Sequence, residues 1–274
     1  MSTPRDLGKK FPSVLDSAYK QHMSHRKVTE IMTRNVIMTS PETTMEDAAK
    51  IMGEKHIGSL IVVKYDTPVG IVTERDLLSK VLARGRIPKE IKVEGEMSYP
   101  LITLCSTATI KEAAQTMIKK KGRLAVFECG NLVGVITASD LVRSLPEAPK
   151  TEVKVDDFMT KEVATADEKA TVSSVARMMG EKRIGSVIVT REGEPKGIFT
   201  ERDLLTTLLA KGRTLSVPVG ESCGSPLIIA PLGTSVHMAA YTMQSKHIKR
   251  LPIAKDSALV GIVTARDLVE AYAK

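Results

Sequence analysis

The chain of 274 residues is 42% apolar and 26% charged, a balance typical of water-soluble globular proteins. Its longest apolar runs, such as SLIVV and PLIIA, are far too short to cross a bilayer, and the first residues lack the apolar core of a signal peptide. The three cysteines are scattered without CxxC spacing, which argues against a secreted disulfide framework and against a zinc site. We therefore expect a cytoplasmic protein that does not associate with membranes.

The net charge of +8 is unevenly distributed along the chain. Residues 1–27 contain six Lys or Arg and two Asp, which gives +4, and the other 247 residues carry the remaining +4. We expect a basic N-terminal arm over residues 1–27, which is either a solvated chain end or a contact for nucleic acid. Excess positive charge also suits small polyanions such as nucleotides.

The first elements after the arm are a short helical lead-in at 28–33 and a short extended strand at 36–40. An amphipathic helix is predicted over residues 43–55, capped by Thr43 or Thr44. Its apolar residues recur at i, i+3, i+4 and i+7 and are Met45, Ala48, Ala49 and Met52.

Two short buried strands are predicted next, at 59–63 and 68–73, because both are apolar runs separated by a turn. Residues 74–85 are predicted to form a second helix that ends at Gly85. The resulting β-α-β-β-α unit has too few elements to cover both faces of its sheet. Two units are therefore expected to pair around a shared core.

The same unit is repeated four times. GIVTERDLL from Gly70 returns as GIFTERDLL from Gly197, after 127 residues. Each of these segments is followed 64 residues later by a similar one, GVITASDLV from Gly134 and GIVTARDLV from Gly261. The chain is therefore two duplicated halves, each containing two units.

We number the four units in chain order and expect a linker between the halves at 146–153, where two prolines interrupt the apolar periodicity. The first pair is expected at 28–145 and the second at 154–274. The unit boundaries are about 28–86, 93–145, 154–213 and 219–272.

The unit resembles the CBS domain, the module named after cystathionine β-synthase. Three features in register carry the resemblance: the lead-in V-x-[DE]-x-M-[TS], the strand entry K-[HR]-I-G-S-[LV]-I-V, and G-[IV]-[IVF]-T-x-x-D-[LI] at the last strand–helix junction. Together they cover about residues 28–145 and 155–272. The unit 4 lead-in departs from the pattern, with Cys223 where units 1 and 2 have Thr33 and Ser98.

This resemblance implies an α+β or α/β fold in which four motifs form two pseudo-twofold pairs, and a homodimer or a disc-like assembly. It also implies a non-catalytic sensor that binds AMP, ADP or ATP in clefts between paired motifs, without a metal. Such a sensor reports to a protein target, which the sequence does not identify. The family sometimes binds S-adenosylmethionine instead.

The Thr-x-x-Asp junctions are the first candidate ligand groups, because an Asp accepts from both hydroxyls of a ribose and the Thr hydroxyl bonds sugar or phosphate. The same spacing is that of a capping box, and both roles can coexist at one helix N-terminus. An Arg inside three junctions lies at the helix end that disfavours cations, so an anion such as phosphate is expected nearby. Unit 2, with Ser139 in place of this Arg, is the weakest candidate. The junction residues are Thr73, Arg75, Asp76, Thr137, Asp140, Thr200, Arg202, Asp203, Thr264, Arg266 and Asp267.

The strand entries supply the second set of candidates. Each unit has a Lys–cation pair there, which either forms a ring around phosphates or complements a helix C-terminus. The small residues that follow in units 1 and 3 would let a base approach the backbone, whereas units 2 and 4 carry Lys and Arg. The strand-entry residues are His56, Ile57, Gly58, Ser59, Lys121, Arg123, Arg183, Ile184, Gly185, Ser186, Lys249 and Arg250. By the resemblance the base slot uses aliphatic residues that would also suit a core, namely Val36, Ile37, Ile57, Val163 and Ile184.

The sequence lacks the nucleophile–base, phosphate-loop and metal-ligand motifs of common enzymes, so an enzyme is not expected. Three other functions stay open. One is a nucleic-acid-binding protein that uses the basic arm and basic rims, although few aromatic residues are present for stacking. The others are an S-adenosylmethionine-binding adaptor and a purely structural adaptor.

Overall fold

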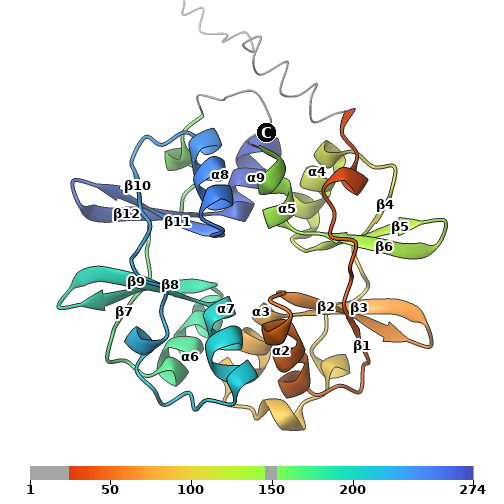
Figure 1. The fold of residues 1–274 in the computed structure, drawn as a ribbon, viewed down its shortest axis with the longest axis horizontal. Helices are drawn as coiled ribbons and strands as arrows, with labels where there is room; N and C mark the ends of the chain where they lie inside the picture. The colour runs from red at the N-terminus through yellow and green to blue at the C-terminus, as the bar shows by residue number, and fades with distance from the viewer. Residues whose placement is uncertain (1–24, 146–152, 274) are drawn as a thin grey trace, which may run out of the picture.

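The computed structural model describes residues 25–145 and 153–273. Its four units lie around a ring, with units 1 and 2 on one side and units 3 and 4 on the other (Figure 1). Most of the expected basic arm and nearly all of the expected linker lie outside the described residues. Among the helices of the described ranges, none is long and apolar enough to cross a membrane.

Every unit contains a three-stranded sheet and helical segments in the order β-α-β-β-α, so the predicted mixed α and β fold of four repeated motifs is confirmed. Unit 1 contains β1 (Met38–Thr39), α2 (Met45–Glu54), β2 (Ser59–Lys64), β3 (Thr67–Thr73) and α3 (Glu74–Asp76). Unit 2 contains β4 (Thr103–Cys105), α4 (Ile110–Lys120), β5 (Leu124–Glu128), β6 (Asn131–Ile136) and α5 (Ala138–Ser144).

The second half repeats this order. Unit 3 contains β7 (Thr165–Asp167), α6 (Val172–Lys182), β8 (Ser186–Arg191), β9 (Glu194–Thr200) and α7 (Glu201–Asp203). Unit 4 contains β10 (Ala230–Pro231), α8 (Val236–Ser245), β11 (Arg250–Lys255), β12 (Ala258–Thr264) and α9 (Ala265–Ala273). The lead-ins are short 3-10 helices, η1 (Val28–Glu30), η5 (Val93–Gly95), η7 (Val155–Asp157) and η10 (Val219–Glu221), and η4 (Pro88–Glu90) links units 1 and 2.

In each sheet the first strand runs parallel to the second, and the third runs antiparallel to it. In unit 1, Met38 aligns with Ile61 across the parallel strands, and Ser59 aligns with Thr73 across the antiparallel strands. A parallel pair needs a crossover connection, which the first helix of the unit supplies.

The first helix of unit 1 forms as the periodicity predicts. Its four apolar residues, Met45, Ala48, Ala49 and Met52, are all buried. The cap is Thr44, whose hydroxyl accepts a hydrogen bond from the backbone N–H of Asp47. The cap and the apolar stripe therefore set the start and the buried face of α2.

The second helix of unit 1 occupies the predicted segment, residues 74–85, but is not a regular α-helix. Three α-helical residues are followed by a π-helix, η2 (Leu77–Val81), and by a 3-10 turn, η3 (Leu82–Arg84), before Gly85 ends the segment with φ of 67°. The Ser79 hydroxyl bonds the carbonyl of Arg75 and competes with the regular helical pattern. Unit 3 repeats the irregularity in η8 (Leu204–Leu208) and η9 (Leu209–Lys211).

The two units of each pair exchange their lead-ins. Thr33 of unit 1 pairs with Val135 of unit 2, and Ser98 of unit 2 pairs with Ile71 of unit 1. The buried Val28 belongs to the apolar core of unit 2 rather than to that of its own unit. Thr160 and Gly224 make the corresponding contacts in the second half, with Ile262 and Ile198. A single unit is thus incomplete, which is the physical basis of the predicted pairing.

Two helical interfaces join the pairs into the ring (Figure 1). Helices α4, α5, α8 and α9 of units 2 and 4 pack around one apolar core. On the other side, α2 packs against η8 and η9 of unit 3, and α6 packs against η2 and η3 of unit 1. Leu205 accordingly joins the core of unit 1, and Leu78 joins that of unit 3. Odd units therefore pack on odd units, and even units on even units.

Candidate functional site

In all four Thr-x-x-Asp junctions the Asp carboxylate caps the Thr, and in units 1 to 3 the junction is a complete capping box. At the first, Thr73 donates to the Asp76 Oδ2 atom from its backbone N at 2.9 Å and from its hydroxyl at 2.6 Å. The other three junctions repeat both hydrogen bonds onto Oδ2 of Asp140, Asp203 and Asp267. Because one carboxylate oxygen serves as the cap, only the Oδ1 oxygen is left for another partner.

The two halves of the chain differ in whether this Oδ1 oxygen has a charged partner. Asp76 Oδ1 lies 2.8 Å from the Lys80 amine, and Asp140 Oδ1 forms an ion pair with Arg143. Within the described part of the chain, Asp203 and Asp267 have no ion pair, and both are only half-buried. Burial raises the pKa of both carboxyl groups. Units 3 and 4 thus retain an accessible acceptor oxygen that units 1 and 2 have used internally.

The strand entries lie directly beside these junctions. The backbone N of Glu74 donates to the Gly58 carbonyl at 3.2 Å, and Ser59 is the ladder partner of Thr73. Unit 3 repeats this arrangement: the Glu201 N donates to the Gly185 carbonyl, and Ser186 pairs with Thr200. In unit 4 the Ala265 N donates to the Lys249 carbonyl, and Arg250 pairs with Thr264.

The predicted base-slot residues approach the same end of the sheet. The Ile37 carbonyl accepts a hydrogen bond from Ile61, two residues into β2, and Ile37 and Ile57 both pack against the unit 1 core. Val163 precedes the equivalent position in unit 3, and Ile184 packs against the core of that unit. These aliphatic residues, with Val36, are half-buried. They border the junction while also contributing to the core.

The Lys–cation pairs at the strand entries are exposed to solvent. Lys55, Lys119, Lys182 and Lys246 are exposed at the C-terminal ends of their helices. His56, Lys121 and Arg183 are exposed and have left-handed backbone with φ of 53°, 57° and 54°. Their position is the one expected for cations that complement helix C-termini.

A different set of charges converges where the units meet. Glu201 of unit 3 is buried and accepts hydrogen bonds from Arg75 of unit 1 at 3.0 Å and from Arg250 of unit 4 at 2.9 Å. Glu74 of unit 1 is also buried, and its Oε1 atom lies 3.8 Å from Arg123 of unit 2. The anion beside Arg75 is therefore a carboxylate of the chain itself, contributed by another unit.

These ion pairs occupy the space beside the strand-entry glycines. A Cβ atom on Gly185 would lie 2.0 Å from Arg250 Nη2, and one on Gly58 would lie 2.8 Å from Glu74 Oε1. We expected the small residues to admit a base, and here they admit charged side chains. The requirement for glycine follows from close approach at both positions.

The two acids are not equivalent. Both oxygens of Glu201 are hydrogen-bonded, whereas Glu74 Oε2 is buried and has no hydrogen-bond partner among the described residues. Burial lowers the pKa of Lys249 to about 8, the charge of Glu74 opposes this shift, and Arg202, Arg123 and Arg250 reinforce it. Three arginines and one carboxylate thus act on Lys249.

The sequence analysis did not single out Glu74 and Glu201, although an alternation in the repeats marks them. Units 1 and 3 have Glu after the junction Thr, where units 2 and 4 have Ala138 and Ala265. At the strand entry, units 1 and 3 have Ser where units 2 and 4 have Arg. Each pair therefore has a Glu in its odd unit and an Arg in its even unit, and this complementary charge indicates that the two side chains contact each other.

Two of the predicted arginines have no ion pair. Arg202 and Arg266 are half-buried and form no salt bridge with another residue in the described ranges. They follow Thr200 and Thr264 directly within the junctions whose Asp keeps an accessible oxygen. No group of three or more His, Cys, Asp or Glu in the described ranges is arranged to hold a metal ion.

The family model of the CBS domain matches the chain four times, at residues 28–83, 89–147, 155–210 and 219–274. The protein MJ1404 of Methanocaldococcus jannaschii is 28% identical over 268 residues, which cover 90% of this chain and 62% of that protein. The chain thus spans less than two thirds of the length of this relative. An inosine-5'-monophosphate dehydrogenase of Thermoplasma acidophilum is 28% identical over 229 residues, 73% of this chain but 46% of the enzyme.

Among solved structures, the protein MJ1225 of Methanocaldococcus jannaschii has the same fold, with a TM-score of 0.75 and 24% identity. The match covers 90% of this chain and 99% of that protein, which is described as a candidate archaeal homologue of γ-AMPK. The ring of four motifs is therefore shared with a solved protein.

Proposed function

Because the chain belongs to the CBS-domain family, which matches it in four segments, we propose that it is a non-catalytic regulatory protein that binds AMP, ADP or ATP in clefts between paired motifs. The matched segments account for nearly the whole described chain. Regulation of a protein target by such a ligand needs no reaction at the site.

The observation that carries the proposal is the state of Asp203 and Asp267. Each carboxylate keeps one oxygen on the helix cap and presents the other without an ion pair in the described chain. A ribose supplies two hydroxyl donors, which would compensate the burial that raises the pKa of these carboxyl groups. We therefore assign the ribose to units 3 and 4, ahead of Thr73/Asp76 and Thr137/Asp140.

Cations near these junctions suit the phosphates. Arg202 and Arg266 lie within the two junctions and form no salt bridge in the described ranges, and Lys249 is half-buried among other cations. A phosphate group would relieve this excess of positive charge by charge-assisted hydrogen bonds. Val163 and Ile184 border the junction of unit 3 and are the candidates for contact with the base.

Calorimetric titration of AMP, ADP, ATP and S-adenosylmethionine tests the proposal. We expect Asp203→Asn or Asp267→Asn to weaken binding by about tenfold or more, because a charge-assisted hydrogen bond to the ribose is lost. Asp140→Asn is the matched control, since its carboxylate is engaged with Thr137 and Arg143. If no nucleotide gives heat or raises the melting temperature, the proposed function is wrong. A loss confined to Asp140→Asn would move the ribose to unit 2.

A further inference from the structure

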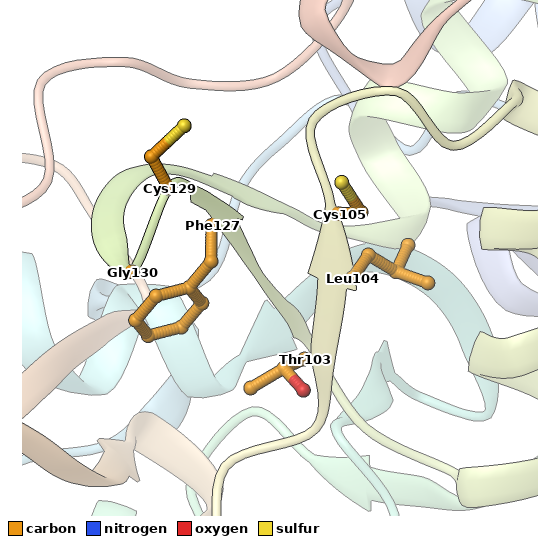
Figure 2. Close-up of a pocket in the computed structure, with 6 residues that line it drawn as sticks. All are labelled: Thr103, Leu104, Cys105, Phe127, Cys129 and Gly130. Atoms are coloured by element: carbon orange, nitrogen blue, oxygen red, sulfur yellow. The ribbon is translucent and has the colours of Figure 1, made fainter.

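A hollow of about 480 Å³ lies on the rim of unit 2, between β4 and the turn that joins β5 to β6 (Figure 2). The strand entry and the Thr-x-x-Asp junction lie at the opposite end of the same strands, where Leu124 pairs with Ile136. The hollow is thus distinct from the candidate nucleotide site, and it is shallow and open to solvent, so a small molecule can reach it. Its lining residues are Thr103, Leu104, Cys105, Phe127, Cys129 and Gly130.

Two of the three cysteines line this hollow, and both are exposed. Cys105 ends β4, and Cys129 lies in the turn after β5; their thiols point to the same side in Figure 2. Cys105 aligns with Phe127 across the parallel strands, so Cys129 lies two residues farther along β5. The two thiols therefore border one space from two different strands.

The environment of Cys105 favours the reactive thiolate. The Thr107 hydroxyl donates a hydrogen bond to the Cys105 sulfur at 3.1 Å. Hydrogen bonds from Thr107 and Ser106 lower the pKa of this thiol. Cys223 is half-buried, and burial raises the pKa of its thiol. Because the thiolate is the nucleophile, Cys105 should react faster than Cys223, which serves as an internal control.

Turn geometry does not explain a cysteine at position 129. Cys129 and Gly130 have φ of 48° and 84°, the pattern of a two-residue turn with left-handed backbone, which favours Asn or Gly. The other three units have Tyr65, Glu192 and Asp256 at the first position of this turn. The turn thus accepts several residue types at this position, and only unit 2 has a cysteine there.

We propose that Cys105 and Cys129 form a thiol–disulfide exchange site that takes a small organic disulfide into the hollow. The Cys105 sulfur attacks one sulfur of the disulfide, a new S–S bond forms, the old one breaks, and one small thiol leaves with the proton that Cys105 lost. The Cys129 sulfur then attacks the Cys105 sulfur and releases the second small thiol with its own proton. The chain loses two electrons to form a Cys105–Cys129 disulfide, and the small disulfide gains them as two thiols.

The second step requires the Cα atoms of Cys105 and Cys129 to lie within about 7 Å of each other, the range in which a disulfide forms. The hairpin tip lies at the rim of the ring and is far from the helical interfaces in Figure 1. Oxidation would therefore change the rim of unit 2 without breaking the cores that join the units.

The test treats the reduced full-length chain with 2-hydroxyethyl disulfide at pH 7, followed by acid quenching and peptide mass mapping. We expect Cys105 to react at least about tenfold faster than Cys223, and the product to be a Cys105–Cys129 disulfide. Cys129→Ser should keep the mixed disulfide on Cys105, whereas Cys223→Ser should change neither the rate nor the product. Circular dichroism of each variant checks that it is folded.

The proposal fails if Cys105 reacts no faster than Cys223. It also fails if the wild-type chain keeps the mixed disulfide on Cys105 while Cys129 stays reduced. Neither result depends on nucleotide binding, so the outcome is independent of the proposed function.

Discussion

Replacing Glu201 by Gln tests whether the carboxylate shared by three units holds the ring together. The Glu201 side chain is 5% exposed and pairs with Arg250, itself 16% exposed, and with Arg75, which is 53% exposed. Removing one partner of a buried ion pair costs about 3–5 kcal/mol, because the other charge stays buried. The half-exposed Arg75 pair adds about 1 kcal/mol or less, since solvent screens it. The glutamine keeps a hydrogen-bond acceptor, so we expect a loss of about 3 kcal/mol.

Glu74→Gln is the matched control for this change. Glu74 occupies the equivalent position in unit 1, but its nearest Arg123 nitrogen is 3.8 Å away, too far for a hydrogen bond, and its Oε2 atom has no hydrogen-bond partner in the described chain. Less pairing is lost, and we expect the free energy of unfolding to fall by about 1 kcal/mol or less.

Urea unfolding followed by circular dichroism at pH 7 measures both changes, with the slope of each transition checked for constancy. The reasoning is refuted if Glu201→Gln and Glu74→Gln destabilise equally, or if Glu201→Gln costs less than about 1 kcal/mol. Either result would mean that the contacts between units depend on the apolar interfaces alone.

Two further predictions concern the odd-unit interface and the central charges. A Cβ atom on Gly180 would lie 2.3 Å from that of Ala83, so Gly180→Ala should cost about 1–3 kcal/mol in urea unfolding, whereas Gly95→Ala, with open space around it, should cost little. The Lys249 pKa of about 8 lies below its usual 10.5, so the unfolded chain binds this proton more tightly and stability should rise with pH between these values. Lys249→Met should be more stable than the wild-type chain at pH 7 and should lack that rise; equal pH profiles would contradict the assignment.

Local features of the fold could be predicted because short-range chemistry determines them. The stripe from Met45 to Met52 and the cap at Thr44 form within one helix, and Gly85 ends its segment because it adopts a left-handed backbone readily. The second helix ends at Gly85 as predicted, but its irregular geometry was not predicted, because the segment packs against another unit. Its π-helical part packs against α6. The approach is close: a Cβ atom on Gly180 of α6 would lie 3.0 Å from the Leu78 carbonyl oxygen.

The long-range contacts were harder to predict from a single sequence. Val28 is a plausible core residue of its own unit, yet it lies in the core of unit 2, because exchanged lead-ins complete each pair. The capping role of the Thr-x-x-Asp spacing was foreseen, but which Asp keeps a second oxygen accessible depends on Lys80 and Arg143, which follow the junction by one helical turn. Such differences between repeats become informative only once their partners are known.

The central charges show how duplication created two unequal halves. Each pair combines an odd unit that supplies Glu with an even unit that supplies Arg, so the pseudo-twofold symmetry is already broken within a pair. When the odd units pack together, Arg75 reaches Glu201, but the described chain has no reciprocal salt bridge from Arg202 to Glu74. Lys249 and Arg202 have no salt bridge in the described ranges, while Glu201 is paired with two arginines. If the proposed ligand is a polyanion, its phosphates therefore gain more beside Lys249 and Arg202 than beside the arginines that Glu201 already neutralises.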